Sequence, residues 1–111
     1  MSQAYDLPRQ TGQLVWCPLD PTLGIGIVMG LESSQVRVKF WRLQDERLYT
    51  TRSAEPIIVR YAIAVGERVR DRGGEEHRVK ARLEVERKGL AIYDLEDGAQ
   101  IVESELIPEV R

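Results

Sequence analysis

The chain has 111 residues, of which 42% are hydrophobic and 31% are charged, and its formal net charge at pH 7 is −2. This length suffices for one domain or two very small ones, and the composition is that of a globular protein. The single cysteine excludes an internal disulfide, and the sequence has no run of 18 apolar residues that could span a bilayer. The small net charge argues against nucleic-acid binding by the whole surface but is compatible with a local basic patch.

The N-terminal region lacks the charged start and apolar centre of a signal peptide, so we expect a cytoplasmic protein. Residues 1–11 are polar and are expected to form a tail. The first strand is predicted at residues 12–17, because this apolar stretch ends at Pro18 and proline cannot donate to a β-ladder.

Residues 23–41 predict a β-hairpin. Val36, Val38 and Phe40 alternate with polar residues, which is the period of a half-buried strand. The preceding apolar run is rich in β-branched residues and glycine, and a polar turn at residues 32–34 joins the two halves.

Two glycines predict a sharp bend in the first arm of this hairpin. Gly24 and Gly26 lie two residues apart on the same face of the strand. Without side chains there, the strand can bend and another backbone can pass close to it. This is how a short strand turns the corner of a small barrel.

Two further strands complete a first unit. A turn is predicted at residues 44–46, a fourth strand at residues 47–51, a break at residues 53–56, and a short buried strand at residues 57–59. Five short strands in about fifty residues are typical of a small barrel.

The second half of the sequence repeats the first. The segment at residues 66–70 corresponds to residues 12–16, 54 residues earlier, and the same spacing pairs Leu90 and Ile92 with Val36 and Val38, and Val102 with Leu48. Leu106-Ile107 corresponds to Ile57-Ile58, which places a length change in the last loop. We therefore predict an all-β fold of two tandem small five-stranded barrels, residues 12–61 and 62–111.

Motifs of catalysis or cofactor binding are not recognisable. The Gly-x-Gly at residues 24–26 has no third glycine, no lysine and no following helix, so barrel-corner glycines explain it better than a phosphate loop. His77 is the chain's only histidine and Cys17 has no companion at ligand spacing, so no zinc site is expected, and His77 is predicted to be a surface residue. The prediction is a non-enzymatic protein without cofactor, metal or small-molecule substrate.

Aromatic and basic residues around the central hairpin are candidates for contact with a partner. Exposed tryptophans stack on partner side chains or bases and take cations. The alternative is that these rings fill the interface between the two barrels. The candidate partner-binding residues are Trp16, Arg37, Lys39, Trp41 and Tyr49.

A second candidate surface is a basic face in the second half. Six basic residues alternate with apolar ones on two strands flanking a Gly73-Gly74 turn, and would share one face if the strands pair. Like charges opposite one another destabilise a sheet, which favours a functional role, but neighbouring acidic residues favour a simply solvated face equally well. These residues, candidates for contact with nucleic acid or an acidic surface, are Arg68, Arg70, Arg72, Arg78, Lys80 and Arg82.

Several of these segments resemble the N-terminal region of the RapA family, bacterial Swi/Snf-type ATPases associated with RNA polymerase. The resemblance covers nearly all of residues 12–107. Its carriers are Gly12-Gln13 with the strand containing Trp16, the segments 23–28, 36–40, 47–49 and 56–57, Gly66-Glu67 and the strand beginning at Gly89-Leu90.

The resemblance implies two tandem Tudor-like barrels that form a non-enzymatic accessory module, which contacts RNA polymerase and regulates an attached ATPase core. The corner glycines after a proline-bearing loop are also similar to the polymerase-interacting domain of CarD and of transcription-repair coupling factors. The alternative function is a nucleic-acid-binding module of a helicase or Swi/Snf-type translocase, contacting DNA or RNA through the basic face. Neither function involves a membrane.

Overall fold

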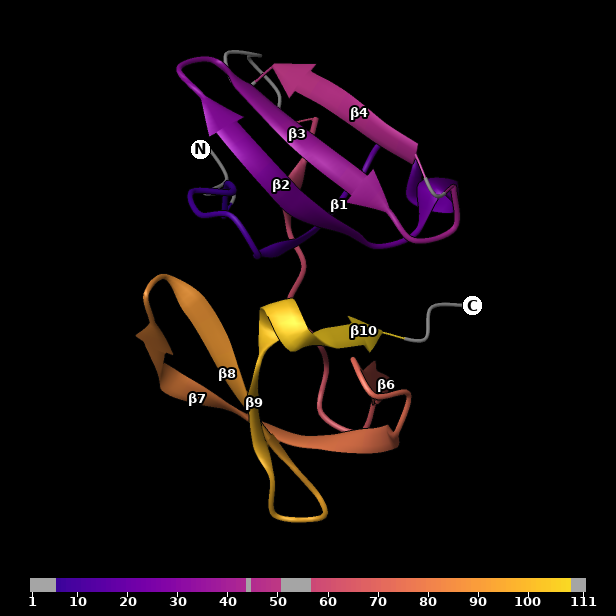
Figure 1. Ribbon diagram of the computed structural model, residues 1–111, viewed down its shortest axis with the longest axis vertical. Coiled ribbons are helices and arrows are strands. Elements are labelled where there is room, and N and C mark those ends of the chain that lie inside the picture. Colours follow the sequence, from indigo (N-terminus) through magenta and orange to yellow (C-terminus); the bar gives the residue numbers. More distant parts are fainter. Residues whose placement is uncertain (1–5, 44, 51–56, 109–111) are drawn as a thin grey trace, which may run out of the picture. The chain divides into compact units, whose positions relative to one another are not determined.

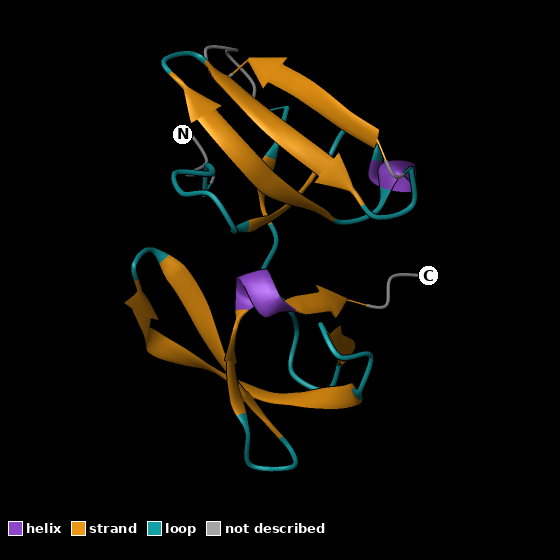
Figure 2. Ribbon diagram, viewed as in Figure 1, coloured by secondary structure: helices purple, strands orange, loops and turns teal. Residues whose placement is uncertain are grey.

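The structure, a computed structural model, describes residues 6–43, 45–50 and 57–108 (Figure 1). The chain divides into two compact units, Met1–Tyr61 (unit 1) and Ala62–Arg111 (unit 2). Each unit contains one five-stranded antiparallel sheet, and the described residues include two short 3-10 turns but no α-helix (Figure 2). The predicted all-β class is therefore confirmed. Within these ranges no helix has the length and hydropathy needed to cross a membrane.

Unit 1 is a meander whose last strand returns to pair with the first. The sheet order is β4-β3-β2-β1-β5, and a 3-10 turn, η1 (Pro21–Leu23), precedes β2. The strands are β1 (Leu14–Trp16), β2 (Gly26–Glu32), β3 (Gln35–Phe40), β4 (Asp45–Thr50) and β5 (Val59–Arg60).

The predicted hairpin is β2 and β3, with its turn at Ser33 and Ser34. The alternation along β3 sends Val36, Val38 and Phe40 into the core, where each is fully buried. They pack there with the other buried members of the cluster, which are Val15, Cys17, Val28 and Ile58.

The corner glycines behave as predicted. Gly24 has a φ of +76°, a left-handed conformation that favours glycine. At Gly26, an added Cβ would lie 2.9 Å from the carbonyl oxygen of Lys39, so the backbone of β3 does pass close to this position.

Two predicted boundaries in unit 1 are wrong. The turn predicted at residues 44–46 lies earlier, at residues 41–43, because Asp45 and Glu46 already pair with Phe40 and Lys39 in the ladder. The strand predicted at residues 57–59 is found at Val59–Arg60, where it pairs with β1. Gln44 and the break predicted at residues 53–56 lie outside the described residues.

Part of the predicted N-terminal tail is attached to the sheet. The backbone N–H of Arg60 donates to the carbonyl of Asp6 at 2.7 Å, and Pro8 is buried. The buried Gln13 side chain accepts hydrogen bonds from the backbone N–H groups of Arg9 and Gln10, at 2.7 and 3.2 Å.

Unit 2 repeats this topology with the order β10-β6-β7-β8-β9. Each strand holds the place of the strand five positions earlier in the chain. A 3-10 turn, η2 (Glu103–Glu105), precedes the last strand. The strands are β6 (Arg68–Asp71), β7 (Glu76–Arg87), β8 (Leu90–Leu95), β9 (Gln100–Val102) and β10 (Leu106–Pro108).

The repeat extends to individual hydrogen bonds. In unit 1 the N–H of Gly12 donates to Val28 at 2.9 Å, and the N–H of Val28 donates to Gln13 at 3.0 Å. In unit 2 Gly66 donates to Val79 at 2.7 Å and Val79 to Glu67 at 3.0 Å. Val79 is therefore the structural counterpart of Val28.

The predicted correspondence in the third strand of the repeat is wrong. Val28 pairs with Val38, whereas its counterpart Val79 pairs with Leu95, so Leu95 and not Ile92 takes the place of Val38. The reason is that the β7–β8 hairpin is longer than the β2–β3 hairpin. Val28 and Val38 are 10 residues apart in sequence, and Val79 and Leu95 are 16 apart.

The sheets are open within the described residues. No pair between β4 and β5, or between β9 and β10, occurs among them. The two five-stranded units are thus present as predicted, whereas their closure into barrels is not observed.

Candidate partner-binding faces

The outer face of unit 1 is built on the side of β3 that points away from the core. Arg37, Lys39 and Trp41 alternate with the buried residues of this strand; Arg37 is exposed, and Lys39 and Trp41 are half-buried. The Nε of Arg37 lies 2.9 Å from Oε1 of Glu46 on β4. Because both side chains are about half exposed, at 49% and 48%, this pair contributes only about 0.2–1 kcal/mol and leaves Arg37 accessible.

Leu48 completes the outer face, and sequence reasoning missed it as a site residue. It is the ladder partner of Arg37 and 62% of it is exposed. A hollow of about 200 Å³ adjoins it, lined by Gly30, Leu31, Glu32, Gln35, Arg37 and Leu48. The available signal was alternation, since its neighbour Tyr49 is apolar in character and faces the core. We keep the name outer face for Arg37, Lys39, Trp41 and Leu48.

The three predicted aromatic residues do not converge. Tyr49 is the ladder partner of Val36, so it faces the core, where its ring meets that of Phe40 edge-on at 6.1 Å. Its hydroxyl donates to the buried thiol of Cys17, and burial, followed by this hydrogen bond, raises the pKa of Tyr49 to about 12. Trp16 packs edge-on against Tyr61 at 6.5 Å.

Trp16 nevertheless lies on the same side of the sheet as Lys39. The row Leu14–Ile27–Lys39 crosses β1, β2 and β3, and alternation puts Trp16 on the side of Leu14. Leu14 and Ile27 are themselves buried.

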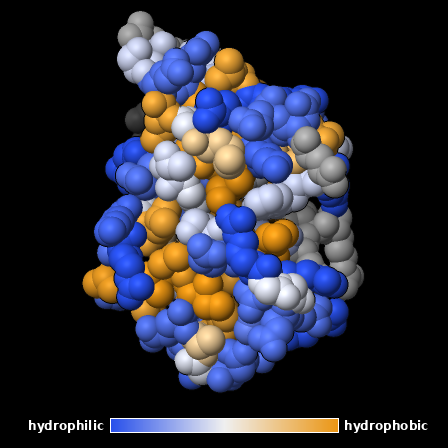
Figure 3. Space-filling view, in the orientation of Figure 1, coloured by the Kyte–Doolittle hydropathy of each residue, from blue (hydrophilic) through white to orange (hydrophobic). Residues whose placement is uncertain are grey.

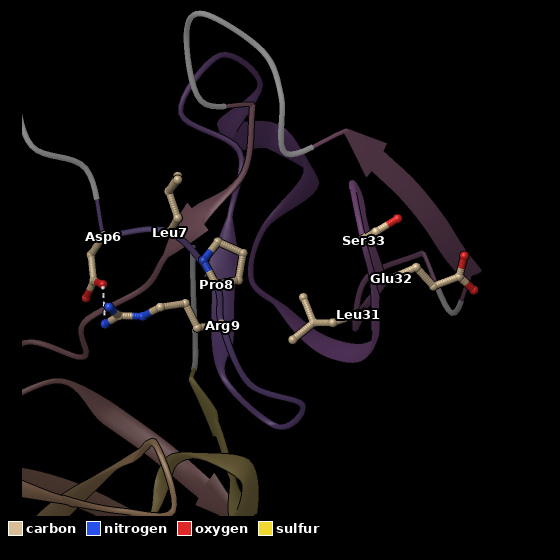
Figure 4. A pocket seen from close by; sticks show the side chains of 7 residues that line it. All are labelled: Asp6, Leu7, Pro8, Arg9, Leu31, Glu32 and Ser33. Carbon is tan, nitrogen blue, oxygen red and sulfur yellow. Dashed lines mark ion pairs between the residues drawn. The ribbon is translucent and has the colours of Figure 1, made fainter.

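A second hollow in unit 1, of about 560 Å³, lies between the N-terminal segment and the β2–β3 turn (Figure 4). Asp6 and Arg9 face each other across it at 3.6 Å, and Glu32 and Ser33 come from its other side (Figure 4). Ser33 has no histidine near it, because the only histidine belongs to unit 2. The described lining therefore offers no nucleophile and base pair.

In unit 2 the predicted basic stripe forms only in part. Arg68 lies directly opposite Arg78, and Arg70 opposite Glu76. Arg68 also forms a long ion pair of 3.9 Å with Glu76, and Arg78 donates to the carbonyl of Gly66 at 3.1 Å.

The remaining members of the stripe are diverted from it. Arg72 donates to the carbonyl of Ser104 at 2.9 Å and pairs with Glu105 at 3.5 Å. Lys80 is the extra residue where the register shifts between Val79 and Ala81, and Arg82 pairs with Glu86 at 3.5 Å. A bulge and local ion pairs thus limit the continuous basic face to Arg68, Arg70 and Arg78.

His77 is not the surface residue that the sequence predicted, since only 9% of it is exposed. Its Nε2 lies 2.8 Å from Oδ2 of Asp71, and its Nδ1 lies 2.7 Å from Oδ2 of Asp97. Asp71, and then Asp97, raise the pKa of His77 against the opposing effect of burial, and contact with the imidazole lowers the pKa values of both carboxyl groups. Glu75 has a ligand-type atom within 4.8 Å, but both ring nitrogens already contact carboxylates, so the group is an ion-pair cluster.

Apolar side chains also reach the surface of both units. Figure 3 shows hydrophobic residues interspersed among hydrophilic ones on the face that it draws. Scattered exposure of this kind is normal in soluble proteins, so it does not define a site by itself.

Comparison with known proteins identifies the first unit. No curated protein matches the chain. Residues 10–58, which span β1 to β4 and the approach to β5, match the family model described as RapA N-terminal Tudor like domain 1. The matched region is a Tudor-like accessory domain and not a catalytic one. Residues 10–58 of this chain therefore belong to the family of the RapA N-terminal Tudor-like domain 1.

Proposed function

We propose that this chain is a non-enzymatic accessory module of the cytoplasmic transcription machinery, which binds RNA polymerase or an attached Swi/Snf-type ATPase core and regulates that core. The observation that carries the proposal is the match of residues 10–58 to the RapA N-terminal Tudor-like domain. The same strand order in unit 2 supports a tandem pair of Tudor-like barrels. This proposal involves no membrane, cofactor or small-molecule substrate.

The outer face of unit 1 is the proposed docking surface. It combines an exposed leucine, an accessible arginine and a half-buried tryptophan, and aromatic residues and arginine are enriched among residues that dominate binding energy. The hollow beside Leu48 gives this otherwise flat sheet face a recess for a partner side chain.

The test is retention of purified bacterial RNA polymerase, and separately of a RapA-type ATPase core, on the immobilised chain. Leu48→Asp should weaken binding at least tenfold, because it places an unpaired carboxylate in a desolvated contact. Leu19→Asp is the matched control, since Leu19 is 71% exposed in the same unit but lies away from the outer face. Trp41→Ala should act in the same direction as Leu48→Asp.

Circular dichroism of each variant checks that the fold is retained. If wild type retains neither partner, the proposed function is wrong. If Leu48→Asp and Leu19→Asp weaken binding equally, the outer face is not the docking surface.

A second candidate function, nucleic-acid binding, is favoured by one observation. Arg68 and Arg78 stand directly opposite each other on exposed positions of unit 2, an arrangement that costs stability unless an anion lies between them. DNA or RNA bound there should dissociate steeply with added salt, and Arg68→Glu with Arg78→Glu should reduce the salt slope by about one for each phosphate that the variant no longer binds. Gel shifts across a salt series decide this, and absence of binding by wild type at low salt would exclude it.

A further inference from the structure

The repeat shows that His77 occupies a position where unit 1 has no side chain at all. Val15 pairs with Gly26 in unit 1, and its counterpart Val69 pairs with His77 in unit 2. Across the sheet, Gly26 pairs with Phe40. Counting two residues beyond the equivalent pairs Val28–Val38 and Val79–Leu95 places Asp97 at the position of Phe40.

The third member of the cluster is also a replacement. Asp71 lies 54 residues after Cys17, at the end of the equivalent strand. Unit 1 therefore fills this corner with Cys17, Gly26 and Phe40, of which the cysteine and phenylalanine belong to the apolar core cluster. Unit 2 fills it with two carboxylates and an imidazole, which the same topology does not need in order to fold.

The contacts in this corner require a charged ring when both carboxylates are ionised. A neutral imidazole has one N–H donor, whereas the imidazolium has two. Both nitrogens of His77 lie within 2.8 Å of carboxylate oxygens. Asp71 is itself held by the N–H of Glu75 at 2.9 Å, and Asp97 by the N–H of Ala99 at 3.1 Å.

The two carboxylates belong to different turns. Asp71 ends β6 and closes the β6–β7 turn, since its carbonyl accepts from the N–H of Gly74 at 3.0 Å. Asp97 lies in the β8–β9 turn, which is closed by hydrogen bonds between Leu95 and Ala99. One ring thus joins two turns that are distant in sequence.

We propose that His77 is a proton-operated clamp, which joins the β6–β7 and β8–β9 turns when the imidazole is charged and releases one of them when it is neutral. The released partner is expected to be Asp97, because its side chain is 54% exposed, against 22% for Asp71. Water can replace the imidazole more easily around the more exposed carboxylate.

Other charged groups near the ring modify the clamp without replacing it. Glu75 approaches from the β6–β7 turn, and Arg68, Glu76 and Arg78 line a hollow of about 280 Å³ beside the ring. Arg68 and Arg78 oppose the charge on the imidazole, and Glu75 and Glu76 favour it.

The pH range of the clamp follows from the directions of the pKa shifts. The pKa of His77 is raised, so its stabilising contribution is complete below 6.5, the ordinary histidine value, and is lost as the pH rises through the folded-state pKa. The pKa values of Asp71 and Asp97 are lowered, so their contribution is complete above 3.8 and is lost as the pH falls through their folded-state values. The clamp is therefore closed between these limits and opens on the alkaline side.

The test uses the whole chain and the NMR signals of its only histidine, which need no assignment by mutation. The ring protons should titrate with a pKa above 6.5, and Asp97→Asn and Asp71→Asn should each lower that pKa. Glu84→Gln is the control for loss of a carboxylate, because Glu84 is exposed on β7 and does not face the ring. A wild-type pKa at or below 6.5 overturns the proposal.

Hydrogen exchange reports the release itself. The N–H of Leu95 bonds to Ala99 and the N–H of Glu96 bonds to Arg78, both at 2.9 Å, so these amides bracket the base of the β8–β9 turn. Their protection factors should fall at least tenfold between pH 6 and pH 9 in wild type, and should be low at both pH values in Asp97→Asn. Protection factors that stay constant across this range in wild type would refute the clamp.

Discussion

Placing a side chain at Gly26 should destabilise unit 1 selectively. A Cβ built there would lie 2.6 Å from Cγ1 of Val38 and 2.9 Å from the carbonyl oxygen of Lys39. Ordinary contacts of this kind begin near 3.4 Å, so the Val38 contact alone requires a displacement of about 0.8 Å in a close-packed core.

The expected cost can be compared with the stability of the unit. Overpacking costs about 1–3 kcal/mol, and a unit of this size is stabilised by roughly 3–9 kcal/mol in total. Gly26→Ala should therefore cost about 2 kcal/mol and lower the melting temperature of unit 1 by about 8–16 °C. Gly26→Val adds two further methyl groups at the same position and should unfold unit 1.

The chain provides separate probes for its two units. Both tryptophans, Trp16 and Trp41, lie in unit 1, and the only histidine lies in unit 2. Thermal unfolding followed by tryptophan fluorescence therefore reports unit 1, while the NMR signals of His77 report unit 2.

Gly30→Ala is the matched control on the same strand. The nearest atom to an added Cβ at Gly30 is a terminal nitrogen of the Arg37 side chain at 3.1 Å, which can move aside. This variant should change stability by less than about 1 kcal/mol. A native melting temperature for Gly26→Val, or equal losses for Gly26→Ala and Gly30→Ala, would refute the close approach of β3 to Gly26.

Two further predictions concern buried polar groups. Glu103 is 1% exposed and accepts a hydrogen bond from the N–H of Ala91 at 2.8 Å, so Glu103→Leu should destabilise unit 2 by about 1–3 kcal/mol, and Glu103→Gln by less because it keeps an acceptor; urea unfolding followed by the His77 NMR signals measures both, and equal stability of wild type and Glu103→Leu would contradict this role of Glu103. The pKa of Tyr49 is raised from 10.0 to about 12, so its neutral form contributes stability that is complete below pH 10 and lost as the pH rises through 12, and Tyr49→Phe should reduce this alkaline loss. Tryptophan-detected melts between pH 9 and pH 12 test this, with Tyr61→Phe as the control, and identical pH profiles for wild type and Tyr49→Phe would show that the hydroxyl is not buried in this way.

The sequence by itself determined the elements that depend on local pattern. The alternation of residues 35–40 was sufficient to predict β3 and its buried face, because a strand shows its two faces with a period of two. Gly26 was recognisable because a residue without a side chain in an apolar strand indicates close approach. The resemblance to the RapA N-terminal region rested on the same short segments, and the family match to residues 10–58 confirms it.

Only the tertiary structure decided which residues meet across the sheets. The side on which Tyr49 lies depends on the start of β4 at Asp45, a boundary that strand pairing shifts by two residues from the predicted one. The basic stripe is interrupted by a register shift at Lys80, and the repeat is offset by a longer β7–β8 hairpin, neither of which has a local sequence signal. His77 is the clearest case, because its burial and charge depend on Asp71 and Asp97, which are 6 and 20 residues away and are brought to it by the pairing of β6, β7 and β8. Local periodicity fixes a strand and its faces, whereas register is set by contacts between strands, which a single sequence does not encode at any one position.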